Sequence, residues 1–370
     1  MTGRRRRVAA ALVTLLAPVA CGDDAPHDEV CGARRDAPGL DPVEPFCERL
    51  STYGFFADLR AQAPAPGVLP YELNTPLFSD HAEKARFVWL PDGTAMSWRD
   101  DEAFDLPVGA VILKTFGFPV DARAPASGRQ LVETRLLVHR ARGWEGAAYV
   151  YDGRGDARLA LEGASRDVAW LDEAGGARQL AYLVPNQNQC KNCHEETKDR
   201  LAPLGPKARH LNRPGPTGSG VDNQLAHWRD LGILVGAPDP AGWPRSAVAS
   251  DPSSGTLEQR ARAWLDISCA HCHNPGGAAR TSGLDLSITA QPAALGVCKA
   301  PVATGRGSAG RQFDIVPGRP DESIVMARIE SNEPEIKMPE LGRTVTDEQG
   351  VALIRAWIAA MPGSCAGAAR

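Results

Sequence analysis

The pattern C-x-x-C-H occurs twice in this chain of 370 residues, as CKNCH at residues 190–194 and as CAHCH at residues 269–273. This pattern is the attachment sequence of c-type haem, because its two thiols reach the two vinyl groups of one porphyrin and the next histidine faces the iron. No other feature of the sequence constrains the fold as closely. The sequence predicts two covalently attached haems, bound through Cys190, Cys193, Cys269 and Cys272, with His194 and His273 as iron ligands.

Two other interpretations of paired cysteines fit less well. A zinc ribbon needs its CxxC pairs about 15 to 20 residues apart, and Cys193 and Cys269 are much further apart. A thioredoxin-like dithiol is expected in a βαβ setting and needs no histidine after it. His271 lies between the cysteines of the second motif, where we expect a surface residue or one beside a haem propionate.

The first residues have the order of a bacterial export signal. Four arginines at 4–7 precede an apolar run at 8–17, and small residues follow up to Cys21. The apolar run is too short to span a bilayer. The segment LLAPVACGDD predicts lipidation of Cys21, although Pro18 stands where such segments carry a branched apolar residue, so secretion without a lipid is the alternative. We expect an exported, periplasmic protein that a lipid anchors to a membrane.

The chain has nine cysteines, which in an exported protein indicate an oxidising compartment. Cys31, Cys47, Cys298 and Cys365 remain after Cys21 and the four motif cysteines are set aside. An even remainder favours two disulfides. Of the three connectivities, we prefer the pairs Cys31–Cys47 and Cys298–Cys365.

Composition limits the partners and the number of domains. The net charge is -4, and residues 4–7 are the one clustered basic run, which argues against a nucleic-acid partner. A chain of this length with 43% hydrophobic residues can bury the cores of two or three domains.

Residues 70–185 have the pattern of an antiparallel β domain. Residues 85–98 (ARFVWLPDGTAMSW) predict a hairpin around a Pro-Asp-Gly turn. Five short runs follow: GAVILKTFGF, RQLVETRLLVHR, GAAYVYDG, DVAWL and RQLAYLVP. Such spacing predicts a sandwich or barrel. Before this domain, residues 22–70 are rich in Pro, Asp and Gly, and are expected to be a tether with one short helix in LSTYGFFADL.

Helical signals dominate after the strands end. Residues 186–250 form a loop-rich first haem segment, with one helix predicted in NQLAHWRDLGIL. In residues 251–370, a capping box at 256–259 opens a helix that runs into the second motif, a second helix is predicted from about Asp321, and residues 346–349 open a third. The predicted fold is multidomain: a β-rich, antiparallel, sandwich-like N-terminal domain followed by an all-α domain.

Residues 251–366 resemble the class I cytochrome c fold. A helix ends in CxxCH, a Met-Pro pair lies in EIKMPELG, and Trp357 on the last helix is placed to pack across the first. Methionine is a frequent sixth ligand where a high haem potential is needed. The resemblance implies Met338 as distal ligand of the second haem, whereas Met326 and Met361 are expected in the core.

The distal ligand of the first haem stays open. No methionine occurs between residues 194 and 325. His210 and His227 are the preferred candidates because they follow the motif on the same segment. The alternatives are a methionine of the C-terminal domain, His81 or His139 of the β domain, or no distal ligand.

A family resemblance extends over most of residues 70–366. It rests on YELNTPLFSDHAEKARFVWLP, FPVDARAPASGRQLVETRLLVHRARGWEGAAYVYD, YLVPNQNQCKNCHEETKDRLAPLGPKARHLN and CAHCHNPGGAARTSGLDL, together with the Met-Pro tail. The combination resembles the SO2930-like dihaem c-type cytochromes, a bacterial family. The resemblance implies two covalent haems c and a periplasmic or outer-membrane location, and it supports the motif cysteines and histidines named above.

We expect an electron carrier that works between periplasmic redox partner proteins. The main alternative is an enzyme, a dihaem peroxidase or oxygenase in which an open first haem binds peroxide or oxygen. A third hypothesis is that the tryptophans of the β domain form a surface for a polysaccharide or a partner protein. Aromatic residues in such strands are more often part of the core.

Overall fold

The computed structural model describes residues 31, 35–197, 200–216, 222–302 and 304–365. Residues 34–370 form one compact unit, which contains every described residue except Cys31. The predicted export signal at residues 1–21, with Cys21, lies outside the described residues. Among the residues that are described, no helix is long and apolar enough to cross a membrane.

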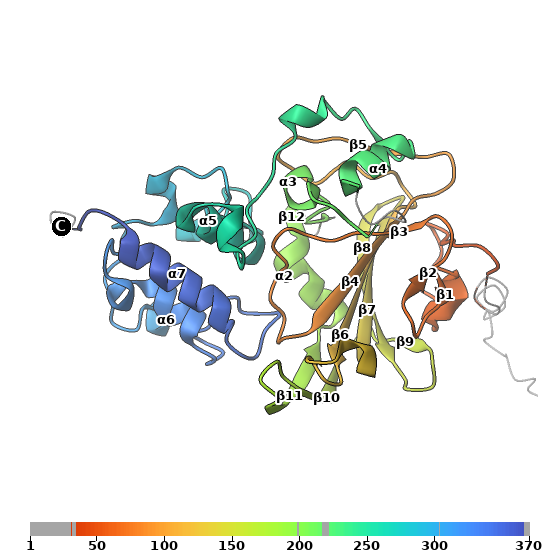
Figure 1. Ribbon diagram of the computed structural model, residues 1–370, viewed down its shortest axis with the longest axis horizontal. Helices are drawn as coiled ribbons and strands as arrows, with labels where there is room; N and C mark the ends of the chain where they lie inside the picture. The colour runs from red at the N-terminus through yellow and green to blue at the C-terminus, as the bar shows by residue number, and fades with distance from the viewer. Residues whose placement is uncertain (1–30, 32–34, 198–199, 217–221, 303, 366–370) are drawn as a thin grey trace, which may run out of the picture. The chain divides into compact units, whose positions relative to one another are not determined.

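An antiparallel sheet dominates the N-terminal region (Figure 1). In the described part of the chain it has eight strands in the order β12-β13-β8-β7-β6-β4-β3, with β9 also paired to β8. The long strands are β4 (Glu83–Trp89), β6 (Val111–Pro119), β7 (Arg129–Arg140) and β8 (Gly143–Tyr151). The short ones are β3 (Val68–Pro70), β9 (Ala157–Leu159), β12 (Glu195–Thr197) and β13 (Arg200–Leu201).

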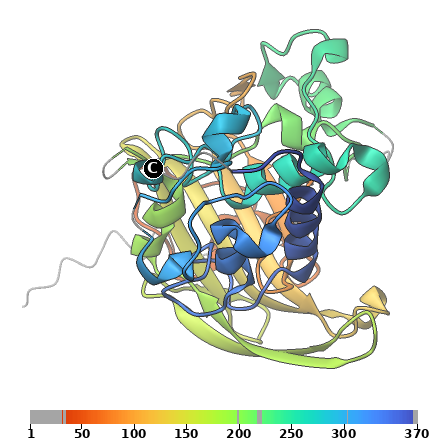
Figure 2. The same cartoon turned by 90° about the vertical axis from the view of Figure 1, so that its left-hand side faces the viewer.

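The long strands coincide with apolar runs of the sequence. β-Branched and aromatic residues dominate β6 (VILKTFGFP), and such residues pack well on a pleated surface. Direct pairing of β6 with β7 and of β7 with β8 places alternate side chains on opposite faces of the sheet. Figure 2 shows these strands running side by side with a marked twist.

One face of the sheet is covered by residues 46–64. Here Tyr53 hydrogen-bonds to Tyr149 of β8, their hydroxyl oxygens 2.9 Å apart, and Phe56 packs edge-on against Phe87 of β4. The sequence assigned this segment to a tether with a short helix. Instead it holds a single 3-10 turn (Leu50–Tyr53) and two short paired strands, β1 (Phe56–Asp58) and β2 (Ala63–Pro64), because its aromatic side chains are buried against the sheet.

The opposite face is covered by separate elements. The hairpin β10 (Ala164–Leu171) and β11 (Ala177–Val184) buries Trp170 and Tyr182 against Phe116 and Phe118 of β6. At the other end of this face, α3 (Ala208–Leu211) and α4 (Gln224–Asp230) share a core with β4. The prediction of an antiparallel β-rich region is confirmed, and the β10–β11 hairpin is a separate two-stranded sheet packed on this face.

The hairpin predicted at residues 85–98 is wrong. Pro91 and Thr94 do form a turn after β4, but β5 (Met96–Ser97) pairs in parallel with β14 (Leu234–Val235). Met96 is fully buried in the core that Leu234 and Trp228 also join. The burial of Met96 with residues far away in the sequence therefore determines which strand β5 pairs with, and the turn at residues 91–94 does not.

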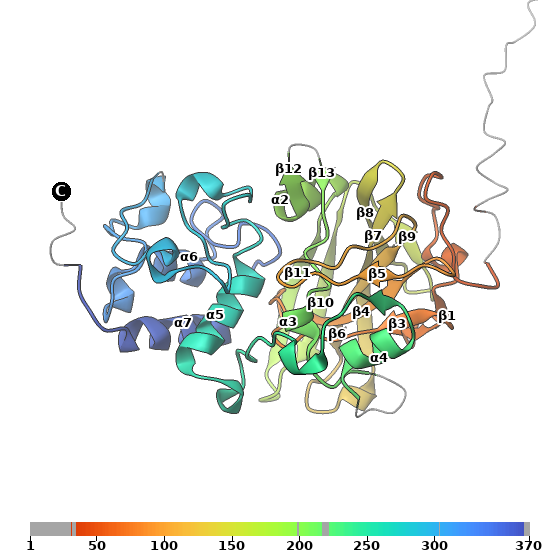
Figure 3. The ribbon, with the colours of Figure 1, turned by 90° about the horizontal axis from the view of Figure 1, so that it is seen from above.

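Helices form the C-terminal region, as predicted. They are α5 (Leu257–Ser268), α6 (Ile324–Glu330) and α7 (Glu348–Ala360), and α5 and α7 lie side by side (Figures 1 and 3). Trp264 of α5 and Trp357 of α7 are buried in one core with the fully buried Met326. Met361 packs against the same core, so both methionines are core residues, as expected.

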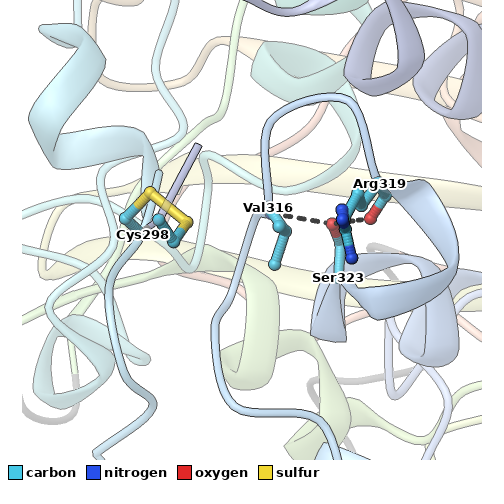
Figure 4. Close-up of a disulfide and its surroundings, with 5 residues drawn as sticks. Cys298, Val316, Arg319 and Ser323 are labelled. Carbon is cyan, nitrogen blue, oxygen red and sulfur yellow. Dashed lines mark hydrogen bonds between the residues drawn. A yellow bond between two sulfur atoms is a disulfide. The ribbon is translucent and has the colours of Figure 1, made fainter. Parts of the chain in front are cut away.

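The helix starts follow capping rules, with two small corrections. The capping box predicted at Thr256 and Gln259 is complete. The second helix starts after Ser323 instead of near Asp321, and the Ser323 hydroxyl does not cap it but accepts from the Val316 N–H and donates to the Arg319 carbonyl (Figure 4). The third is capped by Asp347, whose carboxylate accepts from the Gly350 N–H.

Both predicted disulfides are confirmed. Cys298 and Cys365 are bonded, with their Cα atoms 5.2 Å apart (Figure 4 shows Cys298). Cys31 and Cys47 are the other disulfide-bonded cysteines. Disulfides persist in oxidising compartments, so the protein belongs outside the cytoplasm, in an extracellular or periplasmic setting.

A buried ion cluster connects α5 to the segment that follows the first motif. Asp266, near the end of α5, accepts from Arg209 Nε at 2.9 Å and from His210 Nε2 at 2.8 Å. Only 2% of the Asp266 side chain is exposed. The hydrogen bonds and positive charge of its partners outweigh desolvation and hold the pKa of Asp266 well below its usual range, so it is ionised.

We predict that Asp266→Ala lowers the free energy of unfolding by about 3–5 kcal/mol, because it leaves the buried guanidinium of Arg209 without its counter-ion. Urea unfolding followed by circular dichroism measures the change. Asp230→Ala is the control, since its pair with Arg229 is exposed and should contribute less than about 1 kcal/mol. Equal midpoints for the two variants would show that the buried cluster does not hold these segments together.

Candidate functional site

The first C-x-x-C-H motif forms a compact helical turn directly after β11. Asn186 and Gln189 complete a capping box, and the turn continues through Cys190 into α2 (Lys191–His194). Cys190 lies on the sheet: a Cβ added to Gly146 of β8 would be 3.2 Å from its sulfur. A glycine at this position therefore allows the motif to approach the strand closely.

The second motif continues from α5, as the sequence predicted. The Cys269 N–H donates to the Leu265 carbonyl at the end of the helix, and the His273 N–H donates back to Cys269. Burial raises the pKa of the Cys269 thiol to about 12. The helix thus fixes one end of the motif, and a loop presents the rest.

The two motifs meet through their second cysteines. The ligand atoms of Cys193, His271 and Cys272 all lie within 4.8 Å of one another, and the Cys272 sulfur is 3.3 Å from the Asn192 carbonyl oxygen. The hydrogen bond between the two thiols lowers the pKa of Cys193 and raises that of Cys272. The sequence placed His271 at a surface or beside a propionate. The sequence did not predict that His271 is half-buried and lies next to Cys193 of the first motif.

Both motif histidines have one ring nitrogen fixed by a hydrogen bond. His194 Nδ1 donates to the Ala202 carbonyl at 3.0 Å. His273 Nδ1 donates to the Ser282 hydroxyl at 3.1 Å, and that hydroxyl donates to the Ala279 carbonyl. Among the described residues, neither Nε2 atom forms a hydrogen bond. Burial lowers the pKa of both imidazoles, that of His273 to about 4, so both are neutral, as iron ligation requires.

Met338 lies on the loop between α6 and α7, as predicted. It lines a small cavity of about 20 Å³, together with Trp264 and Ser268 of α5. The second motif begins at the next residue after Ser268. The cavity is much smaller than the roughly 300 Å³ of typical ligand pockets, and none of residues 269–273 is part of its lining.

Arg343 organises the Met338 loop, and sequence reasoning missed it. Its guanidinium donates to the Met338, Ser331 and Val345 carbonyls, among others, and only 5% of the residue is exposed. It also carries positive charge close to Cys269. An arginine followed by Thr-Val gives no sequence signal for this role, which depends on carbonyl groups that converge only in the folded loop.

The candidate distal ligands of the first haem are dispersed. His210 Nε2 is engaged with Asp266, which does not support a role for that nitrogen as an iron ligand. His227 is half-buried on α4, beside α3 and β14. His139 donates from Nδ1 to the Leu106 carbonyl and stacks on Trp144, while His81 is exposed between Phe78 and Trp170. In the part of the chain that the structure describes, none of the four forms a hydrogen bond or ring contact with residues 190–194, so no candidate is preferred.

The tryptophans proposed as a recognition surface are mainly inside the protein. Trp89 and Trp170 are buried, and Trp98 and Trp144 pack against the core beside β5. This placement favours a role in packing.

The residues of the two motifs fit covalent haem: each has two free thiols and a neutral histidine with an oriented ring. The trio Cys193, His271 and Cys272 also has donor types that a single zinc ion prefers. Neither a protein-family model, nor a curated protein, nor a solved structure gives a significant match to this chain.

We predict that Arg343→Met lowers the free energy of unfolding by about 2–4 kcal/mol, because several buried carbonyl groups lose their donor. Arg343→Lys should restore only part of this loss, since an ammonium group lacks the planar fork of a guanidinium. Arg306→Met, which removes an exposed ion pair, is the control. Urea titration gives all three values, and an unchanged midpoint for Arg343→Met would rule out this role.

Proposed function

We propose that this protein is a dihaem c-type cytochrome that relays electrons between redox partner proteins outside the cytoplasm. The observation that carries the proposal is the contact between the two C-x-x-C-H motifs, whose second cysteines lie against each other. Electron exchange depends steeply on distance, so two attachment sites in contact favour exchange between the groups they hold. Haem, when bound, supplies a one-electron couple at each motif.

The residues of the chain have distinct tasks in this proposal. Cys190 and Cys193 hold the first haem, and Cys269 and Cys272 hold the second. His194 and His273 present Nε2 to the iron, and the hydrogen bonds at Nδ1 fix the ring orientation and raise the basicity of the ligand. Met338 is the proposed distal ligand of the second haem. Residues 251–366 would then be a cytochrome c-type domain.

The location proposed for the protein is the periplasm. A lipid on Cys21 would hold the cytochrome at a membrane surface, where partner proteins diffuse in two dimensions.

Two other functions remain distinguishable by experiment. A dihaem peroxidase or oxygenase would need an open first haem, and the scattered distal candidates make that arrangement testable. A single metal ion bound by Cys193, His271 and Cys272 is favoured by their proximity. The haem proposal assigns tasks to both motif histidines and to all four thiols, whereas the single ion uses only two of these six side chains, together with His271.

We predict that the protein isolated from a host with a cytochrome c maturation system carries two covalent haems. Haem-stained denaturing gels and intact mass should show two haem equivalents for the native sequence and one for Cys190→Ala with Cys193→Ala. The matched pair Cys269→Ala with Cys272→Ala should also retain one. A protein that stays colourless and contains one zinc ion would contradict the proposal and favour the single-ion site.

For the iron ligands, we predict that Met338→Ala lowers the potential of one haem or makes it high-spin. Low-temperature electron paramagnetic resonance of the ferric protein measures the spin states, and Met361→Leu in the core is the control. An unchanged spectrum would exclude Met338. A high-spin signal in the native protein that shifts when peroxide or a small anion is added would instead favour the enzyme.

A further inference from the structure

Four cations gather on the sheet face that carries the first motif. Arg86 of β4 is directly opposite Lys114 of β6, which is directly opposite Arg135 of β7. Lys84 lies two residues before Arg86 and therefore on the same face. We call these four residues the cation row. Arg86 is only 7% exposed, and the other three are partly buried.

The cation row has too few anionic partners. Glu133 is fully buried and pairs with Arg135, and it is the one described carboxylate within ion-pair distance of the row. Arg86 Nη2 is buried without a hydrogen-bond partner among the described residues. Lys84 donates to the Leu77 carbonyl, and Lys114 lies 4.9 Å from the ring centre of Phe116. Glu133 is thus the one described carboxylate in a direct ion pair with the row, while Asp80 and Asp347 act on Lys84, and Glu72 on Arg86, only at longer range.

Other nearby carboxylates already have partners elsewhere. Asp80 accepts from the backbone N–H groups of Thr344 and Val345. Asp347 accepts from the Trp264 indole and caps α7. Glu72 pairs with Arg213. None of these three forms an ion pair with the row.

Burying this excess charge is unfavourable without an anion. Desolvation, with repulsion between the cations, lowers the pKa of Lys84 to about 7 and that of Lys114 well below its usual range. A surface that only supports the fold would favour apolar residues here, because a buried charge without a counter-ion is destabilising. The row therefore has the chemistry of a binding site for carboxylate or phosphate groups.

The first haem motif borders the row. Gly146, which contacts the Cys190 sulfur, is opposite Leu137, and Leu137 is on the same face as Arg135. Arg135 is close enough to Cys190 to interact electrostatically with it. Lys114 is likewise close enough to His194 to interact electrostatically with it.

We propose that Arg86 and Lys114, with Lys84 at the end of the row, bind the propionate carboxylates of the haem attached to the first motif. This inference rests on the proposed function. The thioether and propionate edges of a haem c are on opposite sides of the macrocycle. Cys190 is at β8, and Lys114 and Arg86 are two and three strands away, roughly 10–14 Å at the usual strand spacing. The row thus starts beside the motif, where Lys114 is close to His194, and runs away from the attachment thiol across the sheet to Arg86, as this orientation requires.

The test uses a double variant that carries both Arg86→Met and Lys114→Met. It is compared with the native holoprotein, after haem staining has established that two haems are present. Spectroelectrochemical titration measures both midpoint potentials, and Cys190→Ala with Cys193→Ala assigns them by removing the first haem. We expect the potential of the first haem to be lower in the double variant, because two positive charges that stabilise the reduced iron have been removed. The potential of the second haem should be unchanged. The charge-preserving pair Arg86→Lys with Lys114→Arg should retain the native potential.

Controls separate this inference from the proposed function and from misfolding. Arg166→Met removes an exposed cation of β10 and should change neither potential. Circular dichroism and an unchanged second potential establish that the double variant is folded. Unchanged potentials in a folded double variant with two haems would overturn the inference and leave the proposed function intact, whereas absence of haem from the native protein would overturn both.

A calorimetric titration with inorganic phosphate distinguishes a haem carboxylate from a free anion. If propionates occupy the row, the native holoprotein should bind no phosphate there. Saturable binding to the native protein that is lost in the double variant, without a change in potential, would show that the row takes a free anion and would overturn the propionate assignment.

Discussion

The buried carboxylate of Asp266 connects the segments that carry the two C-x-x-C-H motifs. It lies on the last turn of α5, which runs into the second motif, and its donors Arg209 and His210 belong to the segment that follows the first. Asp80 performs a similar task for the Met338 loop by accepting from Thr344 and Val345. Each carboxylate receives several donors in a desolvated setting, where hydrogen bonds to a charge are strongest. These few polar interactions thus connect segments that are far apart in the sequence.

Elements specified by local sequence could be predicted. The strands β6 and β7, the capping box at Thr256 and the helices α5 and α7 all follow from periodicity and capping residues. The pairing of β5 with β14 could not be predicted from the sequence, because it depends on which distant side chains bury Met96. Setting aside Cys21 and the four motif cysteines left four that could pair, and of the three possible connectivities the preferred one, between neighbours in the sequence, is the one observed.

The two C-x-x-C-H motifs of the candidate site could be predicted from the sequence, but the residues that surround them could not. A spacing of two cysteines and a histidine identifies a chemistry, but it does not say that Cys193 and Cys272 meet or that Ser282 orients His273. The cation row did leave a signal. Lys114 lies inside a mostly apolar run in β6, and β4 and β7 also have lysine or arginine among their apolar residues, which is unusual for a buried strand. Only the strand register shows that these charges fall side by side.

The cation row bears on the choice between haem and a single metal ion. An ion held by Cys193, His271 and Cys272 would account for that trio, but it would bring no negative charge to Arg86 or Lys114, which lie across the sheet. A group that is attached at Cys190 and carries two carboxylates on its far edge would account for the thiols, the oriented histidines and the unpaired cations together. The same residues that are costly to bury alone become binding residues once such a group is present. Charge balance, which is independent of the C-x-x-C-H pattern, thus favours the same cofactor.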